Sequence, residues 1–284
     1  MRIAITAEST IDLTKELKEK FDIKTIPFGI LLGDEIIEDG EGVSQKIFDY
    51  VAKTKVLPKT SAVNEEQYKD FFDEVLKSYD AIIHFSLSSG ISCTFENARR
   101  ASENYDNVKV IDSQSLSTGI ALLAIYARQL ANNGDNVEAI FEKVEKRLPY
   151  VQASFVLKRL DYLYKGGRCS RLQLFGANLL KLRPQILVQN GKMGPSKRFR
   201  GNMEKCVMEY CDATLETFNN PDKETVFITY SSAEPQIVEK VKDLLKLNGF
   251  KNIYTTTASG TISSHCGEDC LGILYINDGG EKKD

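Results

Sequence analysis

The chain has 284 residues, of which 42% are hydrophobic and 27% charged, a composition typical of a globular protein with room for two domains. Its formal net charge of −3, without a basic stripe interleaved with aromatic residues, excludes a protein built to bind nucleic acid. No stretch approaches the length of a transmembrane span, and polar residues interrupt the first apolar run too early for a signal peptide, so we expect a cytoplasmic protein.

Six cysteines in a chain of this size predict free, mostly buried thiols rather than disulfides. His265 and Cys266, with Cys270 shortly after them, are a weak alternative as metal ligands, because no CxxC pair accompanies them. We therefore predict neither a metal nor a cofactor.

The first part of the chain predicts a strand, a helix and a hairpin. Residues 3–6 form an apolar strand, and Thr14 is placed to cap a helix that ends near residue 20. A second strand over 23–30 leads into an apolar hairpin that turns near Gly33 and Asp34.

Two polar segments then lead into helices. Ser44 is predicted to cap a helix that runs to about residue 53. An extended polar loop with Thr60 and Ser61 follows, and the next helix begins at Asn64, where Gln67 completes a capping box. This loop therefore brings two hydroxyl groups close to a helix start.

The stretch over 82–102 is the most informative one. An apolar strand is followed by a turn with Ser88, Ser89, Gly90 and Ser92, and then by residues with helical spacing. Small hydroxyl side chains and free backbone N–H groups thus meet at a helix N-terminus, which is a site for an anion. Ser92 could instead serve only as a helix cap. The cluster as a whole favours a bound carboxylate or phosphate.

The first half continues with a strand over 108–112, a buried helix over 120–132 and an amphipathic helix over 137–147. Pro149 marks a boundary. Strands that alternate with helices in this way predict a mostly parallel sheet, in which ligands bind at the carboxyl ends of the strands.

The second half begins with a strand over 151–157 and a short helix that Gly166 and Gly167 end, a position that calls for positive φ. Asn190-Gly191 predicts a further hairpin. The other predicted elements are helices over 172–181, 202–218 and 234–247, strands over 226–230, 253–256 and 271–276, and a polar loop over 258–267. We predict an α/β fold of two α/β domains with mostly parallel sheets, divided as 1–150 and 151–284.

The chain has two histidines, and their settings differ. His84 lies in an apolar strand, which favours a buried, hydrogen-bonded core residue. His265 lies in the polar loop with little packing reason to be an imidazole, so it is a candidate site residue. The sequence contains no GxSxG, HExxH, P-loop or GxGxxG motif. A serine nucleophile with His265 as its base stays open.

A series of motifs covers essentially the whole chain. They are Ile5–Asp12, Lys59–Ala62, Ser88–Phe95, Val110–Ser113 with Gly119, Leu160–Ser170, Lys181–Pro184, Arg198–Gly201 and His265–Gly267. Their order and spacing resemble the DegV family, the bacterial fatty-acid-binding proteins that serve fatty acid kinase. The chain departs from the family pattern at Glu8, Cys93 and Cys169, where Asp, Gly and Ile are usual.

The resemblance implies a long-chain fatty acid in an apolar tunnel between the two domains. By motif match, its carboxyl group would be held by Thr60, Ser61, Ser92 and His265. Arg200 would lie near the mouth and contact the kinase or the phosphoryl group. Residues with a supporting role would be Ser89, Gly90 and Arg168.

The resemblance further implies a carrier rather than an enzyme. A partner kinase would phosphorylate the bound carboxyl group with ATP, and the acyl phosphate would feed phospholipid synthesis, with transient membrane contact left open. One alternative is a serine-dependent acyl or lipid hydrolase that uses Ser92 and His265. A second is a nucleotide or phosphosugar binder, which lacks a glycine-rich fingerprint here.

Overall fold

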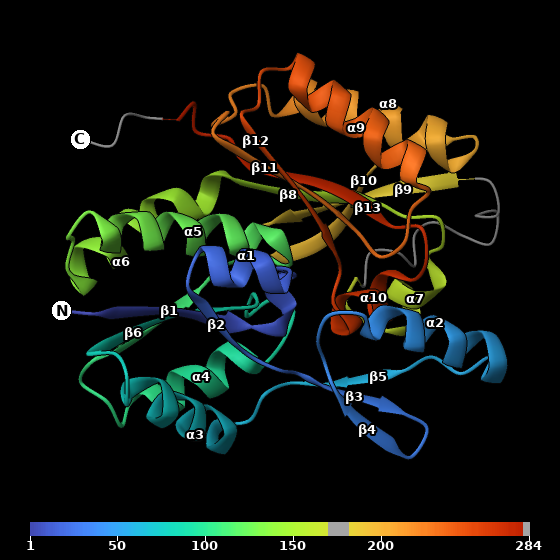
Figure 1. Cartoon of the computed structure of the whole chain (residues 1–284). Helices are drawn as coiled ribbons and strands as arrows, with labels where there is room; N and C mark the ends of the chain where they lie inside the picture. Colours follow the sequence, from blue (N-terminus) through green and yellow to red (C-terminus); the bar gives the residue numbers. More distant parts are fainter. Residues whose placement is uncertain (170–181, 281–284) are drawn as a thin grey trace.

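The structure is a computed structural model, and it describes residues 1–169 and 182–280. The helix predicted over 172–181 lies outside the described residues. In the described part the chain forms three sheets with helices packed around them, and the α/β fold is confirmed (Figure 1).

The first sheet is parallel throughout and has the strand order β2-β1-β6-β7. Its strands are β1 (Ile3–Glu8), β2 (Ile23–Ile26), β6 (Ala81–Ser86) and β7 (Val108–Asp112). All residues of β1 and β6 are buried, as expected of central strands with both faces covered. One face is covered by α3 (Glu65–Leu76) and α4 (Thr94–Ser102), the other by α5 (Thr118–Asn132) and α6 (Val137–Arg147). The parallel sheet predicted for the first half is therefore confirmed.

The second sheet has the order β10-β9-β8-β13-β11-β12. Its strands are β8 (Val151–Val156), β9 (Leu182–Gln189), β10 (Lys192–Arg200), β11 (Thr225–Tyr230), β12 (Asn252–Thr257) and β13 (Leu271–Ile276). Only β11 and β12 run parallel, so the expectation of a mostly parallel second sheet was wrong. Two features cause this: a tight turn with positive φ at Asn190 and Gly191 joins β9 to β10, and β13 inserts antiparallel between β8 and β11.

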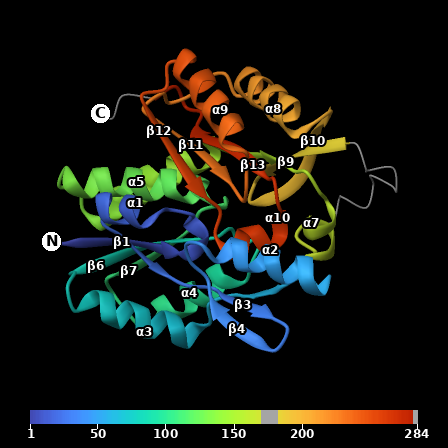
Figure 2. The ribbon, with the colours of Figure 1, turned by 45° about the vertical axis from the view of Figure 1, so that its right-hand side comes forward.

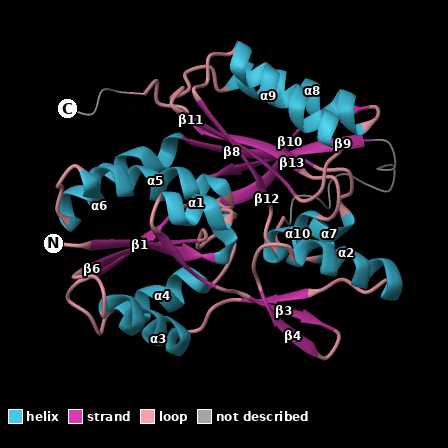
Figure 3. Ribbon diagram, in the orientation of Figure 1, coloured by secondary structure: helices cyan, strands magenta, loops and turns pink. Residues whose placement is uncertain are grey.

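Helix α5 lies between the two large sheets, as Figure 3 shows. It packs on β1 and β6 of one sheet and on β8, β11 and β13 of the other. This explains the near-complete burial that its Leu, Ala and Ile content predicts. The outer face of the second sheet carries α8 (Met203–Thr217) and α9 (Pro235–Leu247).

A small third sheet forms the wall beside the site. It consists of β3 (Gly29–Leu32), β4 (Glu35–Glu38) and β5 (Lys59–Ser61), with the order β4-β3-β5. The predicted hairpin is thus present, but the strand expected over 23–30 is split around Pro27 into β2 and β3, which belong to different sheets.

Two helices pack near this small sheet, α2 (Val43–Thr54) and α10 (Gly260–Cys266). Ser44 does not cap α2: the N-cap is Gly42 in the left-handed region. The Ser44 hydroxyl instead donates to the Ala258 carbonyl, 2.7 Å away, and lies 2.8 Å from Ser263 Oγ. The short elements α1 (Lys15–Lys20), α7 (Asp161–Lys165), η1 (Ser9–Ile11) and η2 (Leu148–Tyr150) complete the described elements.

The two large sheets separate near residue 150, but they share one hydrophobic cluster that contains residues of both. Ile5 and Phe85 of the first sheet belong to it together with Phe155 and Leu274 of the second. The division into two domains at residue 150 stays a prediction. None of the described helices is long and apolar enough to pass through a membrane.

Candidate ligand cavity

A cavity of about 590 Å³ lies where the two halves of the chain meet. It is lined by β5, by the turn after β6, by α10 and by Leu163 of α7. Thr60, Ser61, Ser92 and His265, predicted to hold a carboxyl group, all line it. The fold thus brings together residues up to 205 positions apart in the sequence.

His265 belongs to helix α10 and not to the loop that its Gly- and Ser-rich surroundings predict. The helix forms because Ser259 caps it, accepting a hydrogen bond from the Ile262 N–H. His265 Nε2 lies 3.0 Å from Thr60 Oγ1, so the ring contacts β5. Burial, and then the nearby charge of Arg168, lower the pKa of His265 to about 4. The imidazole is therefore neutral at pH 7.

The second ring nitrogen of His265 decides which tautomer suits the site. Nδ1 is buried and has no hydrogen-bond partner, and it faces the backbone of Gly166. A proton on Nδ1 would be a buried donor without an acceptor, which is costly. A proton on Nε2 can be donated to Thr60 Oγ1, and the Thr60 hydroxyl is then free to donate to an anion in the cavity.

A second polar atom at the cavity also lacks a partner. Thr261 Oγ1 is buried without a hydrogen bond, and Thr261 lines the cavity one turn of α10 before His265. Buried polar groups are almost always hydrogen-bonded. Thr261 is therefore a lining residue whose hydroxyl has no hydrogen-bond partner in the described part of the chain.

The serine-rich turn divides into structural and available hydroxyls. Ser88 is buried and donates to the Gly191 carbonyl, and Ser89 donates to Asp112. Ser92 Oγ accepts from the Thr94 N–H at 3.3 Å, so its own proton is available to a ligand. Helix α4 begins with Cys93 as N-cap, which gives no side-chain cap. Ser92 is thus the serine of the turn best suited to donate into the cavity.

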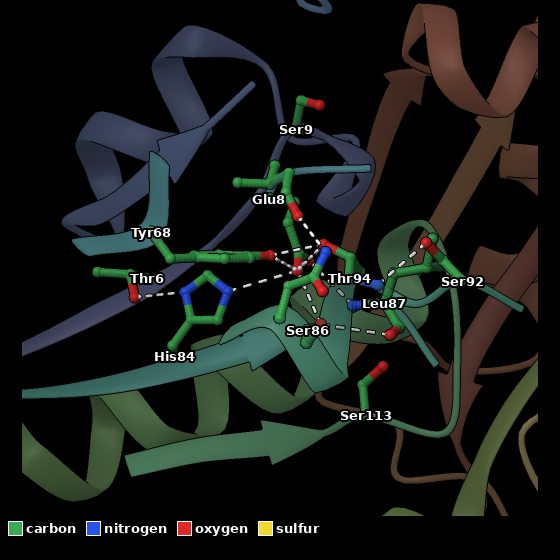
Figure 4. Close-up of polar contacts among 12 residues, drawn as sticks. Thr6, Glu8, Ser9, Tyr68, His84, Ser86, Leu87, Ser92, Thr94 and Ser113 are labelled. Atoms are coloured by element: carbon green, nitrogen blue, oxygen red, sulfur yellow. Dashed lines mark hydrogen bonds and ion pairs between the residues drawn. The ribbon is translucent and has the colours of Figure 1, made fainter. Parts of the chain in front are cut away.

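A buried glutamate contacts the start of this turn (Figure 4). Glu8, at the end of β1, accepts hydrogen bonds from Tyr68 Oη at 2.6 Å, Ser86 Oγ at 2.7 Å and the Leu87 N–H at 2.9 Å. Burial alone raises the pKa of Glu8, but the hydrogen bond and charge of His84, with the Tyr68 and Ser86 hydroxyls, hold it below its ordinary value. The carboxylate therefore ties β6, α3 and the floor of the cavity together.

His84 is the buried core residue that the sequence predicts: its Nδ1 lies 2.9 Å from Thr6 Oγ1 and its Nε2 lies 3.4 Å from Glu8. Sequence reasoning did not identify Glu8 as the centre of this cluster. The available signal was a carboxylate inside an otherwise apolar strand.

The two glycines after α7 serve different purposes. Gly167 has φ +71°, which confirms its predicted role as a helix stop. Gly166 has φ −68° and is instead needed for space, because a Cβ there would lie 2.5 Å from His265 Nδ1. Arg168 donates to the Gly166 carbonyl. The predicted supporting residues Ser89, Gly90 and Arg168 all line the cavity.

Arg200 lies on β10, is exposed, and is not among the described residues that line the cavity. Its position near the mouth stays a prediction. Among the described residues that line the cavity, the cationic side chain is that of Arg168.

The geometry also bears on the two chemical alternatives from the sequence. The Nε2 of His265 contacts Thr60 and the Nδ1 faces Gly166, so neither ring nitrogen is hydrogen-bonded to Ser92 as a hydrolase would require. The described residues contain no group of three His, Cys, Asp or Glu that could hold a metal ion. All six cysteines are free and only Cys93 is exposed, as predicted.

The low pKa of His265 predicts a pH-dependent stability. The unfolded chain binds a proton to this ring near pH 6.5, whereas the folded chain does so only near pH 4. The free energy of unfolding therefore decreases as the pH falls through that window. Between pH 7 and 4, the wild type should lose up to ~3 kcal/mol of unfolding free energy relative to His265→Gln. Urea titrations of both proteins across this range measure the difference. A pH-independent difference would contradict a neutral, buried His265.

Comparison with known proteins shows which family the sequence matches. The family model described as "Uncharacterised protein, DegV family" matches residues 2–278. "Protein DegV" of Bacillus subtilis is 29% identical over 279 residues, covering 97% of this chain and 99% of the relative. A "Fatty acid-binding protein" of Thermotoga maritima is 29% identical over 279 residues, covering 96% of each chain.

Solved structures agree with the fold. The crystal structure of DegV, a fatty acid binding protein from Bacillus subtilis, matches with a TM-score of 0.84 and 27% identity over 98% of this chain and 100% of that chain. A DegV lipid binding protein from Thermotoga maritima matches with a TM-score of 0.86 and 27% identity over 97% and 98% of the two chains. A DegV family protein from Thermus thermophilus, at 24% identity and a TM-score of 0.89 over 98% and 100%, supports the fold alone.

Proposed function

This chain belongs to the DegV family, and on that premise we propose that it binds a long-chain fatty acid in the cavity. The observation that carries the proposal is that the hydroxyl groups of Thr60, Ser61 and Ser92, together with His265 bonded to Thr60, line one cavity beside an apolar wall. Relatives named as fatty acid-binding proteins support the same ligand class.

The carboxylate would be held by hydroxyl groups. Thr60 and Ser92 each have a proton to donate once His265 Nε2–H and the Thr94 N–H have supplied their oxygens with donors. Hydrogen bonds to an ionised oxygen are about twice as strong as neutral ones. The neutral His265 therefore acts through Thr60, by orienting its hydroxyl, rather than through a positive charge.

The tail would supply most of the affinity. Apolar side chains line the cavity, and they come from both halves: Phe28, Leu87, Leu116, Leu163, Met193 and Ile262. At about 0.8 kcal/mol per buried methylene, a sixteen-carbon chain gains roughly 11 kcal/mol before ordering costs are subtracted. The cavity volume of about 590 Å³ is that of an ordinary small-molecule site.

We propose further that the protein is a carrier in the cytoplasm and performs no covalent step itself. It would present the bound carboxyl group to an ATP-dependent fatty acid kinase, with Arg200 near the mouth contacting the kinase or the phosphoryl group. The acyl phosphate would then pass to phospholipid synthesis. The lack of a hydrogen bond between His265 and Ser92 favours this carrier over a hydrolase.

Native mass spectrometry of the protein purified from bacteria, with solvent extraction, tests the ligand class directly. We expect a stoichiometric fatty acid. Ser92→Ala should weaken binding of palmitate by about tenfold, because it removes a hydrogen bond to a charged group. Ser102→Ala is the matched control, since the Ser102 hydroxyl donates to the Arg99 carbonyl of the same helix and Ser102 is not among the described residues that line the cavity.

A ligand-free, folded protein that binds none of several fatty acids would overturn the proposal. A burst of product from an activated ester, lost in Ser92→Ala, would favour the hydrolase instead.

A further inference from the structure

We propose that Asp12 and Asp39 are positioning residues that hold the first turn of α10 and thereby set His265 and Thr261 in the cavity. Neither aspartate lines that cavity, and both come from the first half of the chain. The inference rests on the proposed function, because it assigns residues that shape the carboxyl site without touching the ligand.

Asp12 binds the residue that precedes α10. Its Oδ1 accepts a hydrogen bond from the Ser259 N–H at 2.8 Å, and its Oδ2 accepts from Ser117 Oγ, the residue before α5. Asp12 and Ser117 both adopt positive φ, +56° and +54°, which is unusual for residues with side chains. Such strain persists only where surrounding contacts impose it. One buried carboxylate thus joins the starts of α5 and α10.

Asp39 accepts a hydrogen bond from the following backbone amide, that of Gly260. Its Oδ1 accepts from the Gly260 N–H at 2.7 Å, and its Oδ2 accepts from Ser9 Oγ at 2.8 Å. Gly260 itself is enclosed: a Cβ there would lie 2.5 Å from Ile30 Cδ1 and 2.6 Å from Val43 Cγ1. The start of α10 is therefore fixed by two carboxylates and by close packing.

The two carboxylates suit the helix start electrostatically, since its free N–H groups carry partial positive charge. Burial raises the pKa of Asp12 to about 7, although hydrogen bonds from Ser117 and Ser259 oppose this shift. The negative charge of Asp39 adds to the rise, so the two carboxylates repel one another. Other charged side chains beside them, around a cavity of about 220 Å³, are Lys18, Glu38 and Glu41. Holding two acidic groups together at this place costs free energy that a merely packed helix would not require.

The hydrogen bonds of Asp12 and Asp39 to the start of α10 also set the position of His265. His265 is five residues after Gly260, or about 7.5 Å along the helix axis. Because α10 has only seven residues, a shift at its start moves the imidazole relative to Thr60. Figure 2 shows α10 beside α2, where Ser44 adds a third contact through the Ala258 carbonyl.

The test compares Asp39→Ala with Asp39→Asn, which keeps an acceptor for the Gly260 N–H. The matched control is Asp278→Ala, which removes a part-buried carboxylate bound to Arg147, away from the cavity. Two readouts are measured: the imidazole NMR signals of the ligand-free protein, which has only His84 and His265, and the dissociation constant for palmitate.

We expect Asp39→Ala to shift the His265 signals, to leave those of His84 in place, and to weaken palmitate binding by at least about tenfold. Asp39→Asn should stay within about threefold of the wild type. Asp278→Ala should lower the melting temperature without either effect.

Unchanged His265 signals and affinity in a folded Asp39→Ala protein would overturn the proposal, and so would equal losses in Asp278→Ala. If Asp39→Ala does not fold, Asp12→Ala carries the same test, with the same expected and contradicting outcomes. If the wild type binds no palmitate, the proposed function fails, while the imidazole signals still decide whether the aspartates position His265.

Discussion

Replacing Gly166 with alanine should weaken fatty-acid binding by at least about tenfold while the protein stays folded. The backbone at Gly166 is helical, with φ −68°, so alanine suits its conformation. The new Cβ, however, would lie 2.5 Å from His265 Nδ1 and 3.0 Å from the Tyr162 carbonyl. The imidazole must then move away from Gly166, and its hydrogen bond to Thr60 is lost or lengthened. The Thr60 hydroxyl would no longer be oriented toward a carboxylate.

Isothermal titration with palmitate measures this effect, and a melting curve monitors the fold. Gly194→Ala is the matched control, because Gly194 also belongs to the second half and a Cβ there would meet no atom within 4 Å. Equal affinities for Gly166→Ala and Gly194→Ala would show that the place of His265 does not govern binding.

Replacing Glu8 with alanine should lower the free energy of unfolding by about 3–5 kcal/mol, the largest stability effect that we expect in this protein. The substitution leaves the Leu87 N–H and the hydroxyls of Tyr68 and Ser86 without their buried acceptor. Water cannot easily replace it, because Glu8, Tyr68 and Ser86 are all fully buried. The turn that carries Ser92 should loosen with it.

Denaturant unfolding of Glu8→Ala, Glu8→Gln and Glu138→Ala gives the measurement. Glutamine retains one carbonyl oxygen for the Leu87 N–H, and its amide can donate to hydroxyls that rotate to accept, so we expect a loss of only about 1–2 kcal/mol. Glu138 is exposed on α6 and should change stability by less than about 0.5 kcal/mol. A loss in Glu8→Ala no larger than that in Glu138→Ala would remove Glu8 from the centre of the cluster.

Local signals predicted most elements of the fold. Thr14 caps α1, the Asn64–Gln67 capping box opens α3, and Asn190-Gly191 turns the β9–β10 hairpin. Each of these depends on groups within three residues of one another, whose geometry a sequence expresses directly. The same reasoning was wrong for Ser44, because its hydroxyl binds the Ala258 carbonyl, more than 200 positions away.

The residues of the site could be named from motifs, but their chemistry could not. The sequence predicts Thr60, Ser61, Ser92 and His265 as carboxyl partners, and the fold brings all four to one cavity. It does not predict that His265 is helical, neutral and bonded to Thr60, since these properties depend on burial and on a contact across 205 positions.

By itself the sequence determined the α/β class, the order of helices and strands, and which hydroxyl and imidazole groups could serve a carboxylate. The fold class and the order of the elements follow from periodicity, capping and turn chemistry, all of which act over a few residues, whereas the four carboxyl partners are implied by the resemblance to the DegV family. Only the tertiary structure decided the direction of the second sheet, the burial of Glu8, Asp12 and Asp39, and the space that Gly166 leaves for His265. Burial and close approach are set by parts of the chain far apart in sequence, and so are the pKa values and hydrogen bonds that depend on them.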